Sequence, residues 1–198
     1  MMRPLAILII FASTLPAAEP MKIDLRTVEG VKAVKGEWRY APVRLVEKDE
    51  KGQDGSTVHT TNIEPRAEKP DFDDSSWELV APTSLKDPRG PGRLCFAWYR
   101  TKITLPEGVE GKTVTFVTTV DDYGEIWVDG KLPYTVGQRG GNVVTGFNAP
   151  NRVELADPKP GKTYQIAVFG INGPISVGPI NRIFLKETFL EIADKSAQ

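Results

Sequence analysis

The sequence is poor in the side chains that most often build metal sites and nucleophilic active sites. It holds one cysteine, Cys95, and one histidine, His59, among 198 residues. An internal disulfide and a zinc site with several Cys or His ligands are therefore excluded, and a Ser-His-Asp or Cys-His device would have to use His59. His59 lies in a polar run, which predicts an exposed loop or edge-strand position. Cys95 precedes an aromatic strand, which favours a small buried side chain over a nucleophile.

The sequence also lacks an excess of charge of either sign. Lysine and arginine number 25, aspartate and glutamate number 26, and the formal net charge is -1. This balance provides no bulk attraction to nucleic acid phosphates or anionic lipids. We therefore expect neither nucleic acid nor a membrane as a partner.

Long hydrophobic runs are absent, and the one notable apolar stretch is at the N-terminus. Arg3 precedes the apolar residues 5–12, and small residues follow as far as Ala18. This order is typical of a secretory signal peptide spanning residues 1–18. The run is about eight residues long, whereas a membrane-spanning helix needs roughly 20. We expect a secreted or periplasmic protein, the alternative being a cytosolic protein with a buried N-terminal helix.

Short alternating segments closed by Gly, Pro, Asn or Asp are abundant, whereas apolar periodicity of 3.6 residues is nearly absent. This pattern predicts an all-β protein. Residues 113–120 alternate most clearly and place Val114, Phe116, Thr118 and Val120 on one inward face. The other predicted strands lie near residues 38–46 and at 96–105, 124–128, 131–136, 151–156, 163–169 and 182–192.

Two segments between the predicted strands have distinctive compositions. Asp129 and Gly130 separate residues 124–128 from 131–136, and this dipeptide accepts the positive φ of a two-residue turn, which predicts a hairpin. Residues 47–70 are polar and contain a glycine-rich run. They are predicted to form a long exposed loop or irregular arm.

At least seven strands must bury their apolar faces, and a single open sheet would leave one apolar face in water. Two antiparallel sheets packed face to face solve this problem. We therefore predict a jelly-roll β-sandwich of two antiparallel sheets, forming a single domain over residues 19–198 with its core at about 36–192. Roughly 180 residues suffice for such a domain without a disulfide.

Several motifs occur in the order seen in galactose-binding-like jelly-roll domains. They are DFDDSSW at 71–77, WYR at 98–100, VDDY at 120–123 and IWVDGK at 126–131. Over residues 36–192 the sequence resembles these domains, which accompany many secreted glycoside hydrolases. GFNAPNRV at 146–153 and FGINGPIS at 169–176 resemble the form attached to gluconolactonase-type propellers. The resemblance implies the jelly-roll fold and a role as sugar binder or inter-domain spacer, but not lactonase activity, because the sequence leaves no room for a propeller.

The motif at 71–77 has two physical interpretations. Its short Asp and Ser side chains can accept backbone hydrogen bonds and hold a turn that Phe72 and Trp77 anchor to apolar surface. The carboxylates of Asp73 and Asp74 could instead bind a structural calcium ion. Because no regular Asp-x-Asp-x-Asp-Gly loop is present, the turn is favoured and no cofactor is expected.

The segment Trp98-Tyr99-Arg100 lies in a predicted strand, where neighbouring side chains point to opposite faces. One aromatic ring is therefore expected in the core and the other outside. Arg100 is expected to pair with a carboxylate.

Saccharide sites in proteins combine aromatic rings with amide, carboxylate and guanidinium groups. Such side chains occur in the loops around the predicted hairpin, which a sandwich can bring to one end. Tyr123 would stack on a sugar ring, Asp122 and Asn142 would bind hydroxyls, and Arg139 would donate paired hydrogen bonds. Asn172, with Asn148 and Asn151, adds amides. The alternative is that the asparagines hold backbone groups in turns and that Arg139 is solvated.

Catalytic residues are not expected. A glycosidase needs two carboxyl groups about 5 to 9.5 Å apart across a cleft, whereas Asp121 and Asp122 would point to opposite faces of an extended strand. Glu125 could join one of them. The sequence thus predicts a secreted, non-catalytic carbohydrate-binding-type module, with an interaction domain that docks onto a partner enzyme such as a gluconolactonase-type propeller as the alternative.

Overall fold

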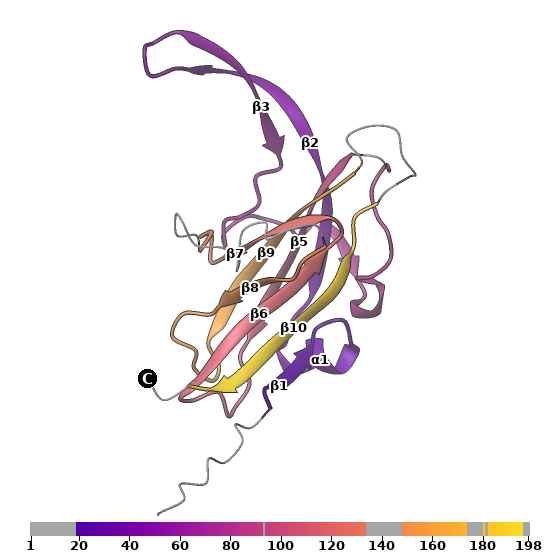
Figure 1. The fold of residues 1–198 in the computed structure, drawn as a ribbon, viewed down its shortest axis with the longest axis vertical. Coiled ribbons are helices and arrows are strands. Elements are labelled where there is room, and N and C mark those ends of the chain that lie inside the picture. The colour runs from indigo at the N-terminus through magenta and orange to yellow at the C-terminus, as the bar shows by residue number, and fades with distance from the viewer. Residues whose placement is uncertain (1–18, 93, 134–147, 174–179, 181, 196–198) are drawn as a thin grey trace, which may run out of the picture.

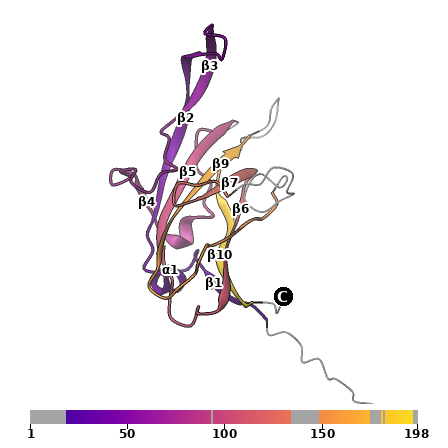
Figure 2. The same ribbon diagram turned by 90° about the vertical axis from the view of Figure 1, so that its left-hand side faces the viewer.

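The computed structural model describes residues 19–92, 94–133, 148–173, 180 and 182–195. These residues form two antiparallel sheets packed face to face, with a β-hairpin projecting from one end (Figures 1 and 2). The predicted signal peptide lies outside the described residues. Within the described part, no helix is long and apolar enough to cross a bilayer.

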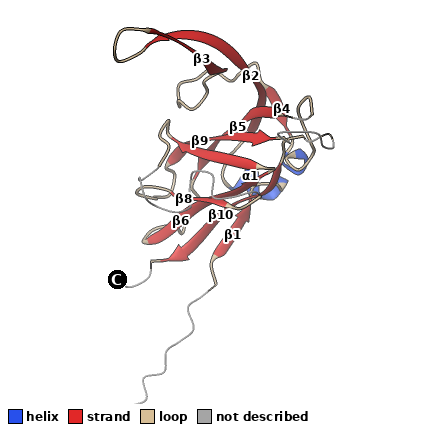
Figure 3. Cartoon of the chain, turned by 45° about the horizontal axis from the view of Figure 1, so that its top comes forward, coloured by secondary structure: helices blue, strands red, loops and turns tan. Residues whose placement is uncertain are grey.

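The first sheet, called the β6 sheet, has the order β1 (Met21–Asp24), β10 (Leu185–Asp194), β6 (Lys112–Val120) and β8 (Asn151–Glu154). The second, called the β5 sheet, has the order β3 (Thr57–Glu64), β2 (Trp38–Lys51), β5 (Cys95–Thr104), β9 (Thr163–Asn172) and β7 (Tyr123–Val128), and β4 (Glu78–Val80) also pairs with β2. The helix α1 (Val28–Ala33) and the 3-10 turn η1 (Pro82–Ser84) complete the described elements, and strands dominate (Figure 3). The predicted all-β jelly-roll sandwich of two antiparallel sheets is confirmed.

The main core lies between the sheets. The predicted inward face of β6 contributes to this core. Its members Val114, Phe116, Thr118 and Val120 are all buried. Tyr99 of β5 and Val168 of β9 pack against it from the β5 sheet. Burial of each such apolar side chain contributes roughly 1.5 to 3 kcal/mol. Cys95 is also buried, with 3% of its surface exposed, as predicted.

A second apolar cluster covers the outer face of the β5 sheet. Trp98 and Phe169 are buried there together with Ala67, which belongs to the irregular segment between β3 and β4. The expectation that one of Trp98 and Tyr99 lies outside is wrong, because both are buried. They do point to opposite faces, but the segment 65–77 lies over the outer face, and Nε1 of Trp98 donates a 2.8 Å hydrogen bond to the carbonyl of Pro65.

The projecting hairpin, called the arm, consists of the distal part of β2 together with β3. Cross-strand pairing continues to Lys51 opposite Thr57, and Figure 1 shows the arm extending beyond the sandwich. The prediction of a loop or irregular arm over residues 47–70 is wrong for β2 and β3, because β-branched residues between 57 and 63 favour a strand. His59 lies on β3, the edge strand, and is exposed as predicted.

The predicted turn at Asp129 and Gly130 is confirmed. Both have positive φ, at 49° and 75°, and the N–H groups of Val128 and Lys131 each donate to the other residue's carbonyl. A full return strand does not form over the described residues 131–133, where only Lys131 bridges to Val128. Instead β7 pairs with β9 along its whole length. Residues 134–136 lie outside the described residues.

Candidate functional site

Two of the predicted ligand-binding residues, Asp122 and Tyr123, lie where β6 passes into β7, at one end of the sandwich. Asp121 and Asp122 form the link between these strands. The N–H of Asp121 donates to the carbonyl of Phe184 (3.1 Å), and the N–H of Asp122 donates to the carbonyl of Ile171 (3.0 Å). The link therefore joins the end of β9 to the segment preceding β10.

The two carboxylates of this link approach the same part of the chain. Asp121 accepts a 3.0 Å hydrogen bond from Nδ2 of Asn172 and forms a 2.8 Å ion pair with Nζ of Lys186. Asp122 accepts a 3.2 Å hydrogen bond from the N–H of Gly173. The expectation that the two side chains point to opposite faces is wrong, because the residues lie in a turn and not in an extended strand. Asp121 thus positions Asn172, and Asp122 keeps one oxygen without a partner among the described residues.

Asn172, another predicted site residue, is almost fully buried, with 1% of its surface exposed. Its Nδ2 also donates to the carbonyl of Arg182, at 2.8 Å. The buried Oδ1 atoms of Asn172 and Asn148 accept no hydrogen bond from any described residue. The N–H of Asn148 donates to the carbonyl of Asp122, at 2.9 Å. This end of the sandwich is therefore rich in hydrogen-bond acceptors.

The asparagines also bind backbone groups, which was the predicted alternative to a role in sugar binding. Nδ2 of Asn151 donates a 2.6 Å hydrogen bond to the carbonyl of Gly124, and Nδ2 of Asn172 binds the carbonyl of Arg182. Both amides hold backbone groups with their nitrogen. Among the described asparagines, the side-chain oxygens of Asn148 and Asn172 lack a donor, and both oxygens are buried.

Tyr123 is the aromatic residue of this cluster. It opens β7, faces outward from the β5 sheet and is 36% exposed. Its neighbour on β9 is Ile171, whose neighbour on β5 is Phe96. These three partly exposed side chains form a row across the sheet, called the apolar row. Sequence reasoning missed Ile171 and Phe96. Side chains alternate between the two faces of a strand, so the register of β5, β9 and β7 places both residues on the outer face.

The structure brings together Asp122, Tyr123 and Asn172. The remaining predicted site residues, Arg139 and Asn142, lie outside the described residues. Glu125 points to the same outer face as Tyr123 and accepts a 3.1 Å hydrogen bond from Nε1 of Trp127. Among the described residues, no hydrogen bond or ion pair joins its carboxylate to Asp121 or Asp122.

The motif at 71–77 forms the predicted turn. Asp73 accepts a 3.0 Å hydrogen bond from the N–H of Ser75, and the hydrogen bonds from Ser75 lower the pKa of Asp73. The rings of Phe72 and Trp77 pack with centroids 5.3 Å apart. Arg100 pairs with Asp74, as predicted. Within the described ranges, no group of three or more His, Cys, Asp or Glu side chains could hold a metal ion.

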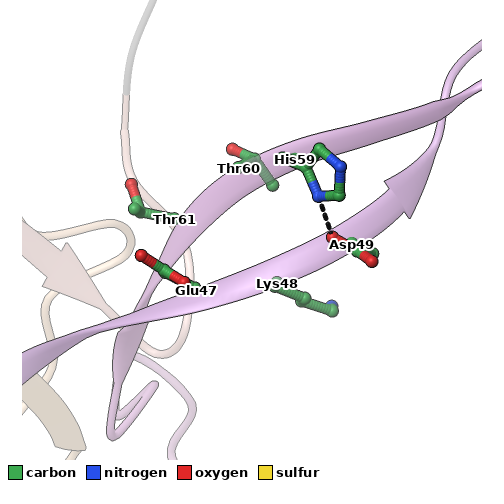
Figure 4. A pocket seen from close by; sticks show the side chains of 6 residues that line it. All are labelled: Glu47, Lys48, Asp49, His59, Thr60 and Thr61. Carbon is green, nitrogen blue, oxygen red and sulfur yellow. Dashed lines mark hydrogen bonds and ion pairs between the residues drawn. The ribbon is translucent and has the colours of Figure 1, made fainter.

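Two further hollows lie outside this end of the sandwich. One, of about 880 Å³, is an open hollow on the arm lined by Glu47, Lys48, Asp49, His59, Thr60 and Thr61, in which Asp49 and His59 form an ion pair (Figure 4). The other, of about 630 Å³, lies at the base of the arm and is mainly apolar, with Leu45, Leu94 and Phe96 among its walls. Cys95 borders it, and burial raises the pKa of this thiol, which disfavours the nucleophilic thiolate.

Comparison by sequence finds no matching protein-family model and no matching curated protein. Solved structures do match. A glycosyl hydrolase family 2 member from Bacteroides cellulosilyticus is 18% identical, with a TM-score of 0.50 over 89% of this chain and 21% of that chain. A calcium-binding mutant of Bacteroides uniformis beta-glucuronidase 2 is 16% identical, with a TM-score of 0.53 over 89% and 18%. A putative beta-galactosidase from Bacteroides fragilis is 17% identical, with a TM-score of 0.50 over 89% and 24%.

These matches define the class of the fold. The chain has the jelly-roll β-sandwich fold that the sequence motifs implied, and it spans about a fifth of the length of the glycosidase chains that it matches. At this level of identity the likeness concerns the fold alone, since one fold serves many functions.

Proposed function

We propose that the protein is a secreted, non-catalytic module that binds a saccharide at the end of the sandwich formed by Asp122, Tyr123 and Asn172. The observation that carries the proposal is the partly exposed side chain of Tyr123 directly after Asp122, whose carboxylate accepts a hydrogen bond from the N–H of Gly173. In this proposal Arg139 and Asn142 complete the site with a guanidinium and an amide.

The chemistry of the site suits a saccharide. Sugar hydroxyls can donate hydrogen bonds to the carboxylate of Asp122. The C–H face of a sugar ring can pack on Tyr123, whose ring is apolar on its face and polar at its tip. The apolar row would extend this surface over Ile171 and Phe96.

A non-catalytic role is supported by the contacts of the carboxylates near Asp122, which already have partners within the protein. Both oxygens of Asp121 are engaged, one by Lys186 and one by Asn172. A glycosidase would need a second carboxyl facing Asp122 across a cleft, and Glu125 instead binds Trp127. Modules of this size and fold form part of the matched glycosidase chains, which supports an accessory role.

The alternative function is an interaction domain that docks onto a partner enzyme, such as a gluconolactonase-type propeller. The apolar row and the projecting arm favour it, because a partly exposed apolar strip near a projecting hairpin is a surface that a partner protein can cover. In this case Tyr123 would contact protein and not sugar.

A calorimetric and glycan-array screen at up to millimolar saccharide, with and without a chelator, tests the proposal. Tyr123→Ala and Asp122→Asn are each expected to weaken binding by about tenfold or more, the loss of roughly 1.4 kcal/mol. Leu79→Ala, which truncates a more exposed apolar side chain on β4, is the control and should leave binding unchanged. Absence of binding across the whole screen would reject the saccharide site and leave the docking domain.

A further inference from the structure

The edge strand of the arm, β3, has backbone hydrogen-bonding groups that its pairing with β2 does not use. At the tip of the arm the N–H of Gly52 donates to the carbonyl of Ser56, and the register is regular from there to Glu64. Because hydrogen-bonded pairs alternate along an antiparallel ladder, the even-numbered residues of β3 bond to β2. The N–H and C=O groups of the odd-numbered residues point away from β2, to an edge that no described strand covers. These residues are Thr57, His59, Thr61 and Ile63.

This edge lacks the features by which proteins block the addition of a further strand. Natural edge strands are short, or they carry charges, proline or bulges. Residues 57–63 contain no Lys, Arg, Asp, Glu or Pro and are mostly β-branched, whereas residues 47–51 of β2 are all charged. The strand has eight residues, whereas the outer strands of the β6 sheet, β1 and β8, have four each. The edge of β3 is therefore long, uncharged and open.

The arm also has little packing of its own. Nearly all of its side chains from residue 48 to residue 60 are exposed, and Figures 1 and 2 show its distal part clear of both sheets. A two-stranded hairpin without a core is marginally stable in water, and further strands are one way to stabilise it. A strand added to β3 would supply both hydrogen bonds and side-chain contacts.

We propose that β3 pairs antiparallel with β3 of a second copy of this chain, about a two-fold axis at Thr60. In this register Thr57 lies opposite Ile63 of the other copy, and His59 lies opposite Thr61. The outward backbone groups of all four odd-numbered residues are then used in both copies. The arms form a four-stranded sheet that joins the β5 sheets of the two copies.

The charges of the strand favour a second copy as the occupant of this edge. His59 is the one ionisable residue between 57 and 63, and it faces the uncharged Thr61, so no like charges lie opposite each other. The charged residues 47–51 of the two copies are separated by both β3 strands. At about 4.8 Å per strand this separation is about 14 Å, which exceeds the Debye length of roughly 8 Å at physiological salt.

The size of the interface sets the strength expected of the dimer. One pair of eight-residue strands buries less than the roughly 1,200 Å² of a stable complex. The chain is therefore monomeric in dilute solution and dimerises as its concentration rises.

Sedimentation velocity of the whole chain, from micromolar to millimolar concentration, tests the proposal. Thr61→Pro removes an outward N–H and leaves the bonds to β2 in place, which proline permits on an edge strand. This variant is expected to weaken dimerisation at least tenfold. Thr61→Val keeps the N–H and the β-branched shape, so it is the matched control and should dimerise like the unaltered chain. Thermal unfolding shows whether both variants are folded.

Cross-linking tests the position of the two-fold axis. In the proposed register the two copies of Thr60 form a non-hydrogen-bonded pair with Cα atoms about 4.5 Å apart, which a disulfide can bridge. Thr60→Cys should therefore link two chains under mild oxidation with oxidised glutathione. Val58→Cys is the matched control, because residue 58 is exposed on the same face but lies about 14 Å from its counterpart. Cys95 is 3% exposed and does not compete.

Three results would overturn the proposal. They are a monomer at every concentration, unchanged dimerisation of Thr61→Pro, or equal cross-linking of the two cysteine variants. The first would leave the edge of β3 to a strand of another protein. The dimer does not depend on the saccharide site, so Tyr123→Ala should leave it intact and Thr61→Pro should leave saccharide binding intact. Failure of one proposal is thus distinguishable from failure of the other.

Discussion

Nε of Arg100 donates a 2.7 Å hydrogen bond to Oδ2 of Asp74, a residue 26 positions earlier in the chain. Arg100 lies on β5 and is 1% exposed. The same guanidinium donates to the carbonyls of Ala67 and Lys69. One strand side chain therefore holds the irregular segment 65–77 against the outer face of the β5 sheet, and this segment in turn covers Trp98.

Removal of the Asp74 carboxylate should show how much the pair of Arg100 and Asp74 contributes to the free energy of unfolding. Asp74→Ala leaves the buried guanidinium of Arg100 without its charged partner, and loss of one partner of a buried ion pair costs about 3 to 5 kcal/mol. We expect a loss of that order in the free energy of unfolding, measured with denaturant. Asp73→Ala, in the same turn but exposed, should cost much less, because solvent screens an exposed carboxylate. Equal effects of the two variants would contradict this role of Arg100.

The indole of Trp98 should stabilise the covering segment through its N–H as well as its ring. Trp98→Phe keeps an aromatic ring but leaves the carbonyl of Pro65 without its 2.8 Å donor, and an unsatisfied buried acceptor costs about 1 to 3 kcal/mol. Trp127→Phe is the comparison, because its N–H binds the half-buried Glu125. The urea midpoint should fall further for the Trp98 variant. A larger fall for Trp127→Phe would show that the segment does not depend on this bond.

The tyrosines of the core should make the protein sensitive to alkali. Burial raises the pKa of Tyr40 to about 12 and also raises that of Tyr99, whereas a tyrosine in the unfolded chain has a pKa of about 10. Below pH 10 both states keep the proton. Between about pH 10 and 12 only the unfolded state releases it, so stability falls through this range.

Thermal unfolding between pH 9 and pH 12 measures this effect. Tyr40→Phe removes the ionisable group and keeps the ring, so the unfolding temperature of the variant should fall less steeply above pH 10 than that of the unaltered protein. Comparison of the two chains cancels the contribution of the lysines, which titrate in the same range. Parallel curves would show that Tyr40 does not titrate differently in the two states.

The arm should be dispensable for folding. Nearly all residues from 48 to 60 are exposed, and Glu47 lies directly opposite Thr61. Replacement of residues 48–60 by Asn-Gly, which favours a two-residue hairpin turn, should change the free energy of unfolding by less than about 1 kcal/mol, as expected for surface changes. Loss of cooperative unfolding would show instead that the arm stabilises the sandwich.

The predicted site could be assembled only in part from the sequence. Asp122 and Tyr123 are neighbours in the chain, so their proximity needed no fold. Asn172 joins them because β9 pairs with β7 in a register that sets Tyr123 opposite Ile171.

The amino-acid sequence by itself determined the central strands β5, β6, β7 and β9, the buried face of β6 and the turn at Gly130. These features follow from the alternation of side chains along a strand and from the backbone freedom of single residues, both of which act over a few positions. Only the tertiary structure decided that β7 pairs with β9, that residues 65–77 bury Trp98, and that Asp121 meets Asn172. Each of these depends on contacts between residues far apart in the chain, whose partners are chosen by packing and register and not by local pattern.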